Sequence, residues 1–213
     1  MKPMQHSFRR FLEKITSKKA PGPSPVFSIF HVLSALELIS EKAIGRSKLT
    51  EELGVGEGTV RTMIQRLKDA EIITTSKRGC TLTSKGQRLR KEYTTIFTKK
   101  VQIGKSELTL ADYNFAVLVK NQGHKIKSGI EQRDAAIMIG AKGATTIIFK
   151  EGHLVIPSVS NDIAEDFPEA ANQIIRFLKP EENDAIIIGS ASDSIKAEYG
   201  ALAAAWTILD DSD

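Results

Sequence analysis

The apolar residues in the middle of the N-terminal half recur with the period of a helix. Between positions 60 and 67 they are spaced at i, i+3, i+4 and i+7, which places them on one face of a helix predicted for residues 57–70. This apolar stripe consists of Val60, Met63, Ile64 and Leu67. The opposite face carries side chains that donate hydrogen bonds, and its acidic residues are confined to the two ends. The pattern predicts an amphipathic helix with a donor-rich outer face.

Short elements surround this helix in a recognisable order. A helix predicted for residues 47–53 and a Gly-containing turn come before it, and two short strands separated by a basic turn follow it. The strands are predicted at residues 72–75 and 80–83, and the turn between them is Lys77-Arg78-Gly79. Helix–turn–helix–strand–turn–strand is the layout of a winged helix, whose second helix can lie in the major groove of DNA.

These segments resemble those of winged helix-turn-helix transcriptional regulators. The similarity is carried by Ser47-Lys48-Leu49 through Leu53-Gly54-Val55, by Gly58-Thr59-Val60-Arg61 and by the Leu-Thr-x-Lys-Gly segment at residues 82–86. In that superfamily such a segment commonly ends the wing and opens the next helix. The resemblance covers about residues 27–97 and implies the fold and DNA binding, but not the target. The whole chain also resembles a small group of archaeal proteins of undefined function, in which such a domain precedes a compact α/β domain.

Charge is distributed unevenly along the chain. Residues 1–98 contain 18 Lys and Arg against 9 Asp and Glu, a balance of +9, whereas residues 99–213 contain 12 against 17, a balance of −5. Because nucleic-acid affinity rests largely on neutralising phosphates, the N-terminal half is expected to face a polyanion. The acidic half is not expected to contact DNA.

The winged-helix interpretation assigns separate roles to individual side chains. Four residues on the outer face of the long helix are predicted to reach base edges: Thr59, Arg61, Thr62 and Gln65. Five others are predicted to contact phosphates: Ser47, Lys48, Arg66, Lys77 and Arg78. One winged helix contacts few base pairs, so we expect a homodimer on two half-sites of double-stranded DNA.

The chain is predicted to consist of an arm and two domains. Residues 1–25 form an N-terminal arm with a Pro-rich linker, interpreted as loosely attached, as packing on a partner subunit or as touching the DNA backbone. Residues 26–98 form the winged helix-turn-helix domain. Residues 99–213 form an α/β domain for effector binding or dimerisation, whose element order, ββα-ββα-βα, indicates a two-layer sandwich with helices on one face of a mainly antiparallel sheet. Its first strand is predicted from residue 101, and its second helix over about residues 163–178. The predicted fold class is α+β.

A turn rich in small residues, at residues 189–194, is the candidate ligand site of the second domain. It joins a short apolar strand to a helix, where free backbone amides and hydroxyl groups can hold a phosphate or carboxylate of a small effector. The candidate ligand-binding residues are Ser190, Ser192, Asp193 and Ser194. Capping of the following helix by Ser190 or Asp193 is the alternative explanation.

Composition and motifs narrow the function classes. No apolar run approaches the about 18 residues that a membrane span needs, so we expect no membrane partner and a cytoplasmic location. The single cysteine, Cys80, cannot form an intrachain disulfide or a thiolate zinc site. Neither a Walker pattern nor a G-x-S-x-G elbow occurs, and the histidines are scattered. The pair Glu131 and Asp134 is interpreted as part of a solvated helical face. No catalytic residue, metal or cofactor is therefore predicted.

The expected function is a sequence-specific DNA-binding transcriptional regulator with a C-terminal ligand-sensing or dimerisation domain. Two alternatives remain open at this point. One is an enzyme in which a winged helix is fused to a domain that acts on a small anionic or nucleotide substrate. The other is a winged-helix module that binds proteins.

Overall fold

The computed structural model describes residues 2–17 and 26–209, which belong to two compact units. The first unit comprises residues 1–93 and the second comprises residues 94–213. The division lies near the end of a helix and slightly before residue 98, where the sequence places the domain boundary. Among the described residues, no helix is long and apolar enough to cross a membrane.

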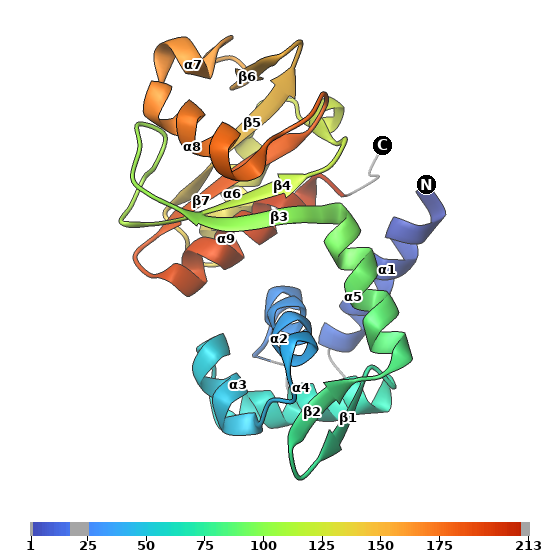
Figure 1. Cartoon of the computed structure of the whole chain (residues 1–213). Helices are drawn as coiled ribbons and strands as arrows, with labels where there is room; N and C mark the ends of the chain where they lie inside the picture. Colours follow the sequence, from blue (N-terminus) through green and yellow to red (C-terminus); the bar gives the residue numbers. More distant parts are fainter. Residues whose placement is uncertain (1, 18–25, 210–213) are drawn as a thin grey trace. The chain divides into compact units, whose positions relative to one another are not determined.

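The N-terminal unit consists of helices and one small sheet (Figure 1). Its elements are α1 (Lys2–Thr16), α2 (Ile29–Glu41), α3 (Arg46–Leu53), α4 (Glu57–Asp69), β1 (Ile73–Ser76), β2 (Gly79–Leu82) and α5 (Ser84–Ile96). The helix–turn–helix–strand–turn–strand order predicted from the sequence is confirmed, with bounds that differ by one residue or so. Gly54 has a φ of 64° and ends α3 in the left-handed conformation that favours glycine.

Strands β1 and β2 form an antiparallel hairpin that is fastened to the chain before α3. Ser76 pairs with Gly79 across a two-residue turn. The backbone of Ile44 exchanges two hydrogen bonds with Cys80, at N···O distances of 3.2 and 2.8 Å. Gly79 is required at this crossing, because its φ is +119° and a Cβ there would lie 2.5 Å from the backbone of Ile44. The hairpin is therefore joined by backbone hydrogen bonds to the segment leading into α3.

Helix α1 is packed against its own unit, in contrast to the interpretation of the N-terminal segment as loosely attached. Phe8, Leu12 and Ile15 on its apolar face are buried, and α1 contacts α2. These residues recur at i, i+4 and i+7, which is the spacing that allows a helix to bury one face. The Pro-rich linker of the predicted arm, at residues 20–25, lies outside the described residues.

The C-terminal unit contains a five-stranded sheet and the remaining helices. Its elements are β3 (Phe97–Ile103), β4 (Tyr113–Val119), a 3₁₀ turn η1 (Gly123–Lys125), α6 (Ile130–Met138), β5 (Gly143–Lys150), β6 (His153–Val155), α7 (Ile163–Asp166), α8 (Pro168–Leu178), β7 (Ala185–Ala191) and α9 (Ser194–Thr207). The strand order is β3-β4-β7-β5-β6, and every neighbouring pair is antiparallel. The α+β class and the predicted ββα-ββα-βα order are confirmed.

The helices cover both faces of this sheet, so the predicted arrangement with helices on one face is wrong. Ile186 and Ile188 of β7 belong to the core that also contains the apolar residues of α7 and α8. Gly189 points the opposite way, and a Cβ there would lie 2.5 Å from backbone atoms of Ala197 and Ala201 in α9. All seven residues of β7 are buried as a result. Figure 1 shows α8 and α9 on opposite sides of the sheet.

Two element boundaries also differ from the sequence prediction. The helix predicted over residues 163–178 is divided into α7 and α8 at Phe167, and Pro168 occupies the first position of α8, where a missing backbone N–H costs nothing. The strand predicted from residue 101 begins at Phe97, directly after α5. Phe97 is buried and stacks on Trp206 of α9, with ring centroids 6.4 Å apart.

Candidate nucleic-acid interface

Helix α4 presents the predicted division between a buried and an exposed face. Val60, Met63 and Leu67 are fully buried. Arg61, Thr62 and Gln65 are exposed, whereas Thr59 is half-buried. Thr59 precedes Met63 by one helical turn, which places it at the margin of the apolar stripe. Of the four residues predicted to read bases, three are thus available on the open face.

The donors on this face differ in their present partners. The hydroxyl of Thr62 donates to the carbonyl of Gly58 at 3.0 Å, and Nε2 of Gln65 donates to Oδ1 of Asp69 at 2.7 Å. Arg61 has no hydrogen bond or ion pair with any residue that the structure describes. Exposed local bonds of this kind contribute little and exchange readily with water or a ligand. Arg61 is therefore the side chain on α4 that is best prepared to bind an external acceptor.

The start of α3 offers a further basic position, which is partly neutralised within its own helix. Ser47 and Lys48 are exposed. Nζ of Lys48 lies 2.9 Å from a carboxylate oxygen of Glu52 and 3.0 Å from one of Glu51. These hydrogen bonds, first to Glu52 and then to Glu51, raise the pKa of Lys48. A phosphate would have to compete with two carboxylates for this ammonium group.

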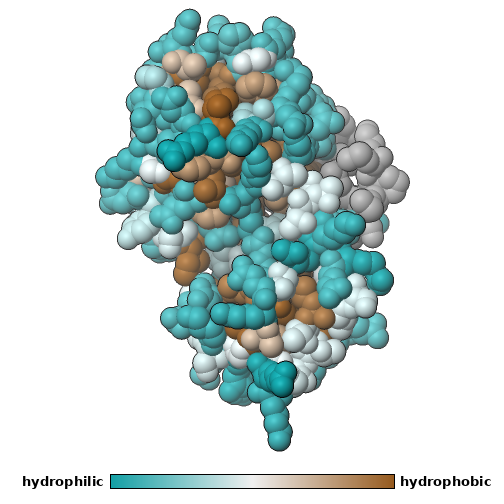
Figure 2. Space-filling view, in the orientation of Figure 1, coloured by the Kyte–Doolittle hydropathy of each residue, from teal (hydrophilic) through white to brown (hydrophobic). Residues whose placement is uncertain are grey.

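The turn between β1 and β2 carries the predicted pair Lys77 and Arg78. Both side chains are exposed, and neither is paired with a described residue. The backbone N–H of Arg78 donates to the hydroxyl of Ser76 at 3.1 Å, which fixes the form of the turn. The tip of this hairpin, at the bottom of Figure 1, is hydrophilic in Figure 2. This geometry suits contact with a phosphate backbone.

Arg66 does not belong to the exposed surface, so its assignment as a phosphate contact is wrong. Its exposed fraction is 8%, and Nη1 donates to the carbonyl of Ile15 at 2.7 Å and to that of Ser17 at 2.6 Å. The guanidinium also lies 5.6 Å from the ring centroid of Phe27. Arg66 satisfies the carbonyls at the C-terminal end of α1 and holds that helix against α4.

The exposed basic residues Lys68 of α4 and Arg46 of α3 are not among the contacts assigned from the sequence. Lys68 follows Arg61 by seven residues on α4, a spacing that puts both on the same side of the helix. Arg46 is the first residue of α3. Helical spacing alone would have identified Lys68 as a better candidate than Arg66, which follows buried Met63 by three residues. With these positions included, the exposed cations of α3, α4 and the hairpin turn form the candidate interface.

The turn after β7 does not form the predicted ligand site. Strand β7 continues to Ala191, so Ser190 is a buried strand residue with an exposed fraction of 1%. Its hydroxyl donates to Oδ1 of Asn114 at 2.7 Å and accepts from the backbone N–H of Leu110 at 3.1 Å. This buried hydroxyl already donates one hydrogen bond and accepts another within the protein, so it is not available to a ligand.

Asp193 caps α9, which agrees with the alternative explanation given for this turn from the sequence. Its carboxylate accepts from the backbone N–H of Lys196 at 2.8 Å, and the Lys196 ammonium lies 2.8 Å from it. The side-chain and backbone hydrogen bonds from Lys196 hold the pKa of Asp193 below its usual range. A carboxylate at this position repels an anion, so the exposed Ser192 and Ser194 alone do not make an anion site.

The other candidate side chains give no further site. Asp134 is paired with its neighbour Arg133 at 2.8 Å on an exposed face, in agreement with a solvated helix. His153 lies 2.7 Å from Asp162, a pairing that the sequence did not indicate, and Asp162 caps α7. Within residues 2–17 and 26–209, no three His, Cys, Asp or Glu side chains are grouped so that they would hold a metal ion.

Comparison with known proteins identifies both parts of the chain. Residues 29–88 match the model of the N-terminal domain of PH0730-like proteins. Residues 110–208 match the domain of unknown function DUF4443. No match was found among curated proteins.

A solved structure extends this likeness to almost the whole chain. The hypothetical protein PH0730 from Pyrococcus horikoshii OT3 is 30% identical, with a TM-score of 0.70 over 87% of this chain and 95% of that one. The chain thus belongs to a class of two-domain proteins of archaeal type. It is a member of the PH0730-like family.

Proposed function

We propose that the N-terminal unit is a winged helix that binds double-stranded DNA, and that the protein is a sequence-specific transcriptional regulator. In this proposal α4 enters the major groove, and the β1–β2 hairpin is the wing that contacts the adjacent phosphates. Arg61, Thr62 and Gln65 read base edges. Lys68, Lys77 and Arg78 neutralise phosphates, together with Ser47 and Lys48 at the start of α3.

The observation that carries the proposal is the set of unpaired cations on exposed parts of α4 and the hairpin turn. Arg61, Lys77 and Arg78 have no partner among the described residues. These cations can contact phosphates without first breaking an internal ion pair. The +9 balance of residues 1–98 adds a long-range attraction for a polyanion.

The C-terminal unit is proposed to bring two copies together. Its balance of −5 makes it unsuited to DNA, and a single winged helix covers too few base pairs for a rare genomic site. Helix α6 exposes Ile130, Ile137 and Met138, with exposed fractions of 53%, 48% and 87%. Exposed large apolar side chains grouped on one helix are typical of a protein–protein contact.

The function is tested by selecting bound fragments from genomic DNA of the source organism with the full-length protein. We expect a shared sequence motif, with an affinity that falls linearly on a logarithmic scale as salt concentration rises. Selection of fragments without a shared motif would leave only non-specific DNA binding. Absence of binding at low salt would refute the winged-helix function altogether.

Replacement of Arg61 by alanine is expected to weaken specific binding by about 1–3 kcal/mol, because a bidentate contact to a guanine edge is lost. Binding of random DNA should change much less. The measurement is a competition gel shift with operator and random duplexes at one salt concentration. Arg88→Ala, which removes an exposed arginine of α5, is the matched control. Equal operator affinity of the Arg61 and Arg88 variants would show that Arg61 does not contact a base edge.

Replacement of Lys77 by alanine in the wing should have a different signature. A phosphate contact is independent of sequence, so operator and random DNA should both be bound more weakly by the same factor. The slope of log affinity against log salt should decrease in magnitude by about one unit. Titrations at four or more salt concentrations measure this slope. A variant with an unchanged slope would show that the wing turn does not contact phosphate.

A further inference from the structure

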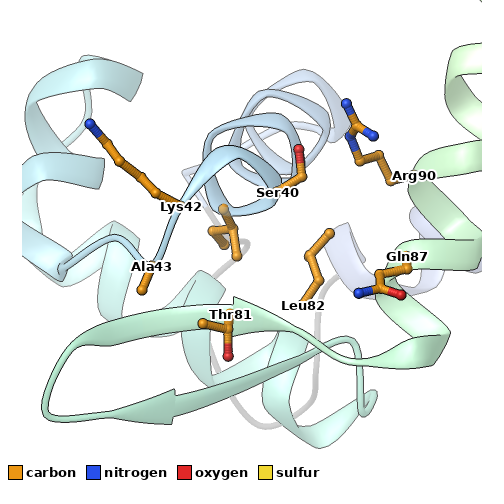
Figure 3. A pocket seen from close by; sticks show the side chains of 8 residues that line it. Ser40, Lys42, Ala43, Thr81, Leu82, Gln87 and Arg90 are labelled. Carbon is orange, nitrogen blue, oxygen red and sulfur yellow. The ribbon is translucent and has the colours of Figure 1, made fainter.

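A pocket of about 490 Å³ lies in the N-terminal unit, and none of the side chains that line it is among those assigned to DNA (Figure 3). Four segments contribute to it: the end of α2, the link to α3, strand β2 and helix α5. The lining residues are Ile39, Ser40, Lys42, Ala43, Thr81, Leu82, Gln87 and Arg90. Volumes of about 300–1,000 Å³ are usual for small-molecule sites.

The lining combines positive charge with a small apolar surface. Figure 3 shows Lys42 and Arg90 on opposite sides of the pocket, with Leu82 between them. Neither cation has a hydrogen bond or ion pair with any described residue, and no lining residue is acidic. Half-buried Leu82 supplies apolar contact, whereas Ile39 is buried beneath the pocket, and Thr81 and Gln87 supply neutral polar groups. A ligand that satisfies all of these features has an anionic group and a compact apolar body.

We infer that this pocket binds a small organic acid between Lys42 and Arg90, with its apolar body packed on Leu82. Charge-assisted hydrogen bonds to a carboxylate are about twice as strong as neutral ones, and Arg can form two of them in parallel. Inorganic phosphate satisfies the cations but leaves the side chain of Leu82 uncovered. A neutral aromatic molecule does the reverse. The carboxylic acid alone uses both parts of the lining.

The position of the pocket connects its occupant to the proposed DNA-binding elements. Lys42 and Ala43 lead into α3, and this segment is fastened to the hairpin by the Ile44–Cys80 pairing. Thr81 and Leu82 belong to strand β2 of the hairpin itself. An acid bound between Lys42 and Arg90 also removes positive charge from the unit that carries the balance of +9. Such an acid should weaken DNA binding several-fold, and this regulatory step rests on the proposed function.

Binding is tested with the full chain in the absence of DNA, by calorimetric or NMR titration with benzoate, benzyl alcohol and inorganic phosphate. Benzoate should bind saturably, and at least about tenfold more tightly than either other probe. Lys42→Gln and Arg90→Gln should each weaken benzoate about tenfold. Arg88→Gln removes the same charge from the same helix outside the pocket and should leave benzoate affinity unchanged. Both pocket side chains end in solvent, so melting temperatures should be unaffected.

Several results would overturn the inference. They are failure of benzoate to saturate at millimolar concentration, equal affinity in all variants, or phosphate binding as tight as that of benzoate. If Lys42→Gln and Arg90→Gln weaken DNA without affecting benzoate, the two cations belong to the DNA surface and the pocket is not an acid site. DNA affinity with and without benzoate is measured separately. If the wild-type protein does not bind DNA even without benzoate, the proposed function is refuted, but the benzoate titration still decides whether the pocket binds an acid.

Discussion

Replacement of Asp184 by alanine is expected to destabilise the C-terminal unit by about 2–5 kcal/mol. Asp184 precedes β7, has an exposed fraction of 1%, and accepts hydrogen bonds from the backbone N–H groups of Asn121 and Glu181 at 2.9 and 2.8 Å. Its carboxylate also lies 3.1 Å from the ammonium of Lys120. Alanine leaves both N–H groups without this acceptor and removes the counter-charge of Lys120. Urea unfolding followed by the fluorescence of Trp206, the single tryptophan, reports on this unit.

Glu181→Gln is the matched control for this change. Glu181 pairs with the same lysine at 2.6 Å, but its side chain is 77% exposed, so water screens the pair. Exposed ion pairs contribute about 0–1 kcal/mol, and the control should lose no more than that. Equal losses for the Asp184 and Glu181 variants would mean that Asp184 acts only through Lys120. The backbone hydrogen bonds would then have no measurable role.

The elements of the N-terminal unit were predictable because short-range patterns determine them. The apolar spacing along α4 requires a helix with one buried face, whatever packs against it. Gly54 marks the end of α3, and Lys77 and Arg78 form a polar turn between two β-prone segments. The open face of α4 followed from the same spacing. Arg61, Thr62 and Gln65 were therefore placed on it correctly.

Contacts between distant parts of the chain were not predictable in this way. Arginine side chains are usually exposed, so the residue type alone places Arg66 on the surface. Its burial depends on hydrogen bonds to the carbonyls of Ile15 and Ser17, about fifty positions earlier. The local sequence predicts a turn at Ser190 because Gly189 precedes it. Gly189 is instead required by the close approach of α9, which no local pattern records. The Asp184 network likewise joins the ends of two strands that are far apart in sequence.

The packing of helices on both faces of the C-terminal sheet could be predicted only in part from the sequence. A strand whose residues are all apolar is buried on both faces, and residues 185–188 of β7 have this character. Read with that rule, the short apolar strand indicates helices on both sides of the sheet. The ββα order gives the sequence of elements, but not the face on which each helix packs. Successive residues of a strand point to opposite faces of the sheet, and this alternation shows which face each helix covers. Ile186 and Ile188 point to α8, whereas Gly189 points to α9.

The DNA affinity is expected to reside entirely in the N-terminal unit. The cut is best made between Ile96 and Phe97, where α5 ends and β3 begins, so that neither element is shortened. Phe97 and Thr98 are uncharged, and the two fragments keep the balances of +9 and −5. Residues 97–213 should show no binding where the full chain is saturated, because an acidic fragment repels the phosphates.

The fragment of residues 1–96 should bind DNA with a similar salt slope per N-terminal unit, but more weakly than the full chain. The C-terminal unit is proposed to pair two copies, and its removal loses the gain from binding two half-sites at once. Gel shifts on single and double half-sites measure both effects, after circular dichroism and Trp206 fluorescence have shown that each fragment is folded. Binding of residues 97–213 as tight as that of the full chain would contradict this division. Equal affinity of residues 1–96 and the full chain for a double site would instead place dimerisation in the N-terminal unit itself.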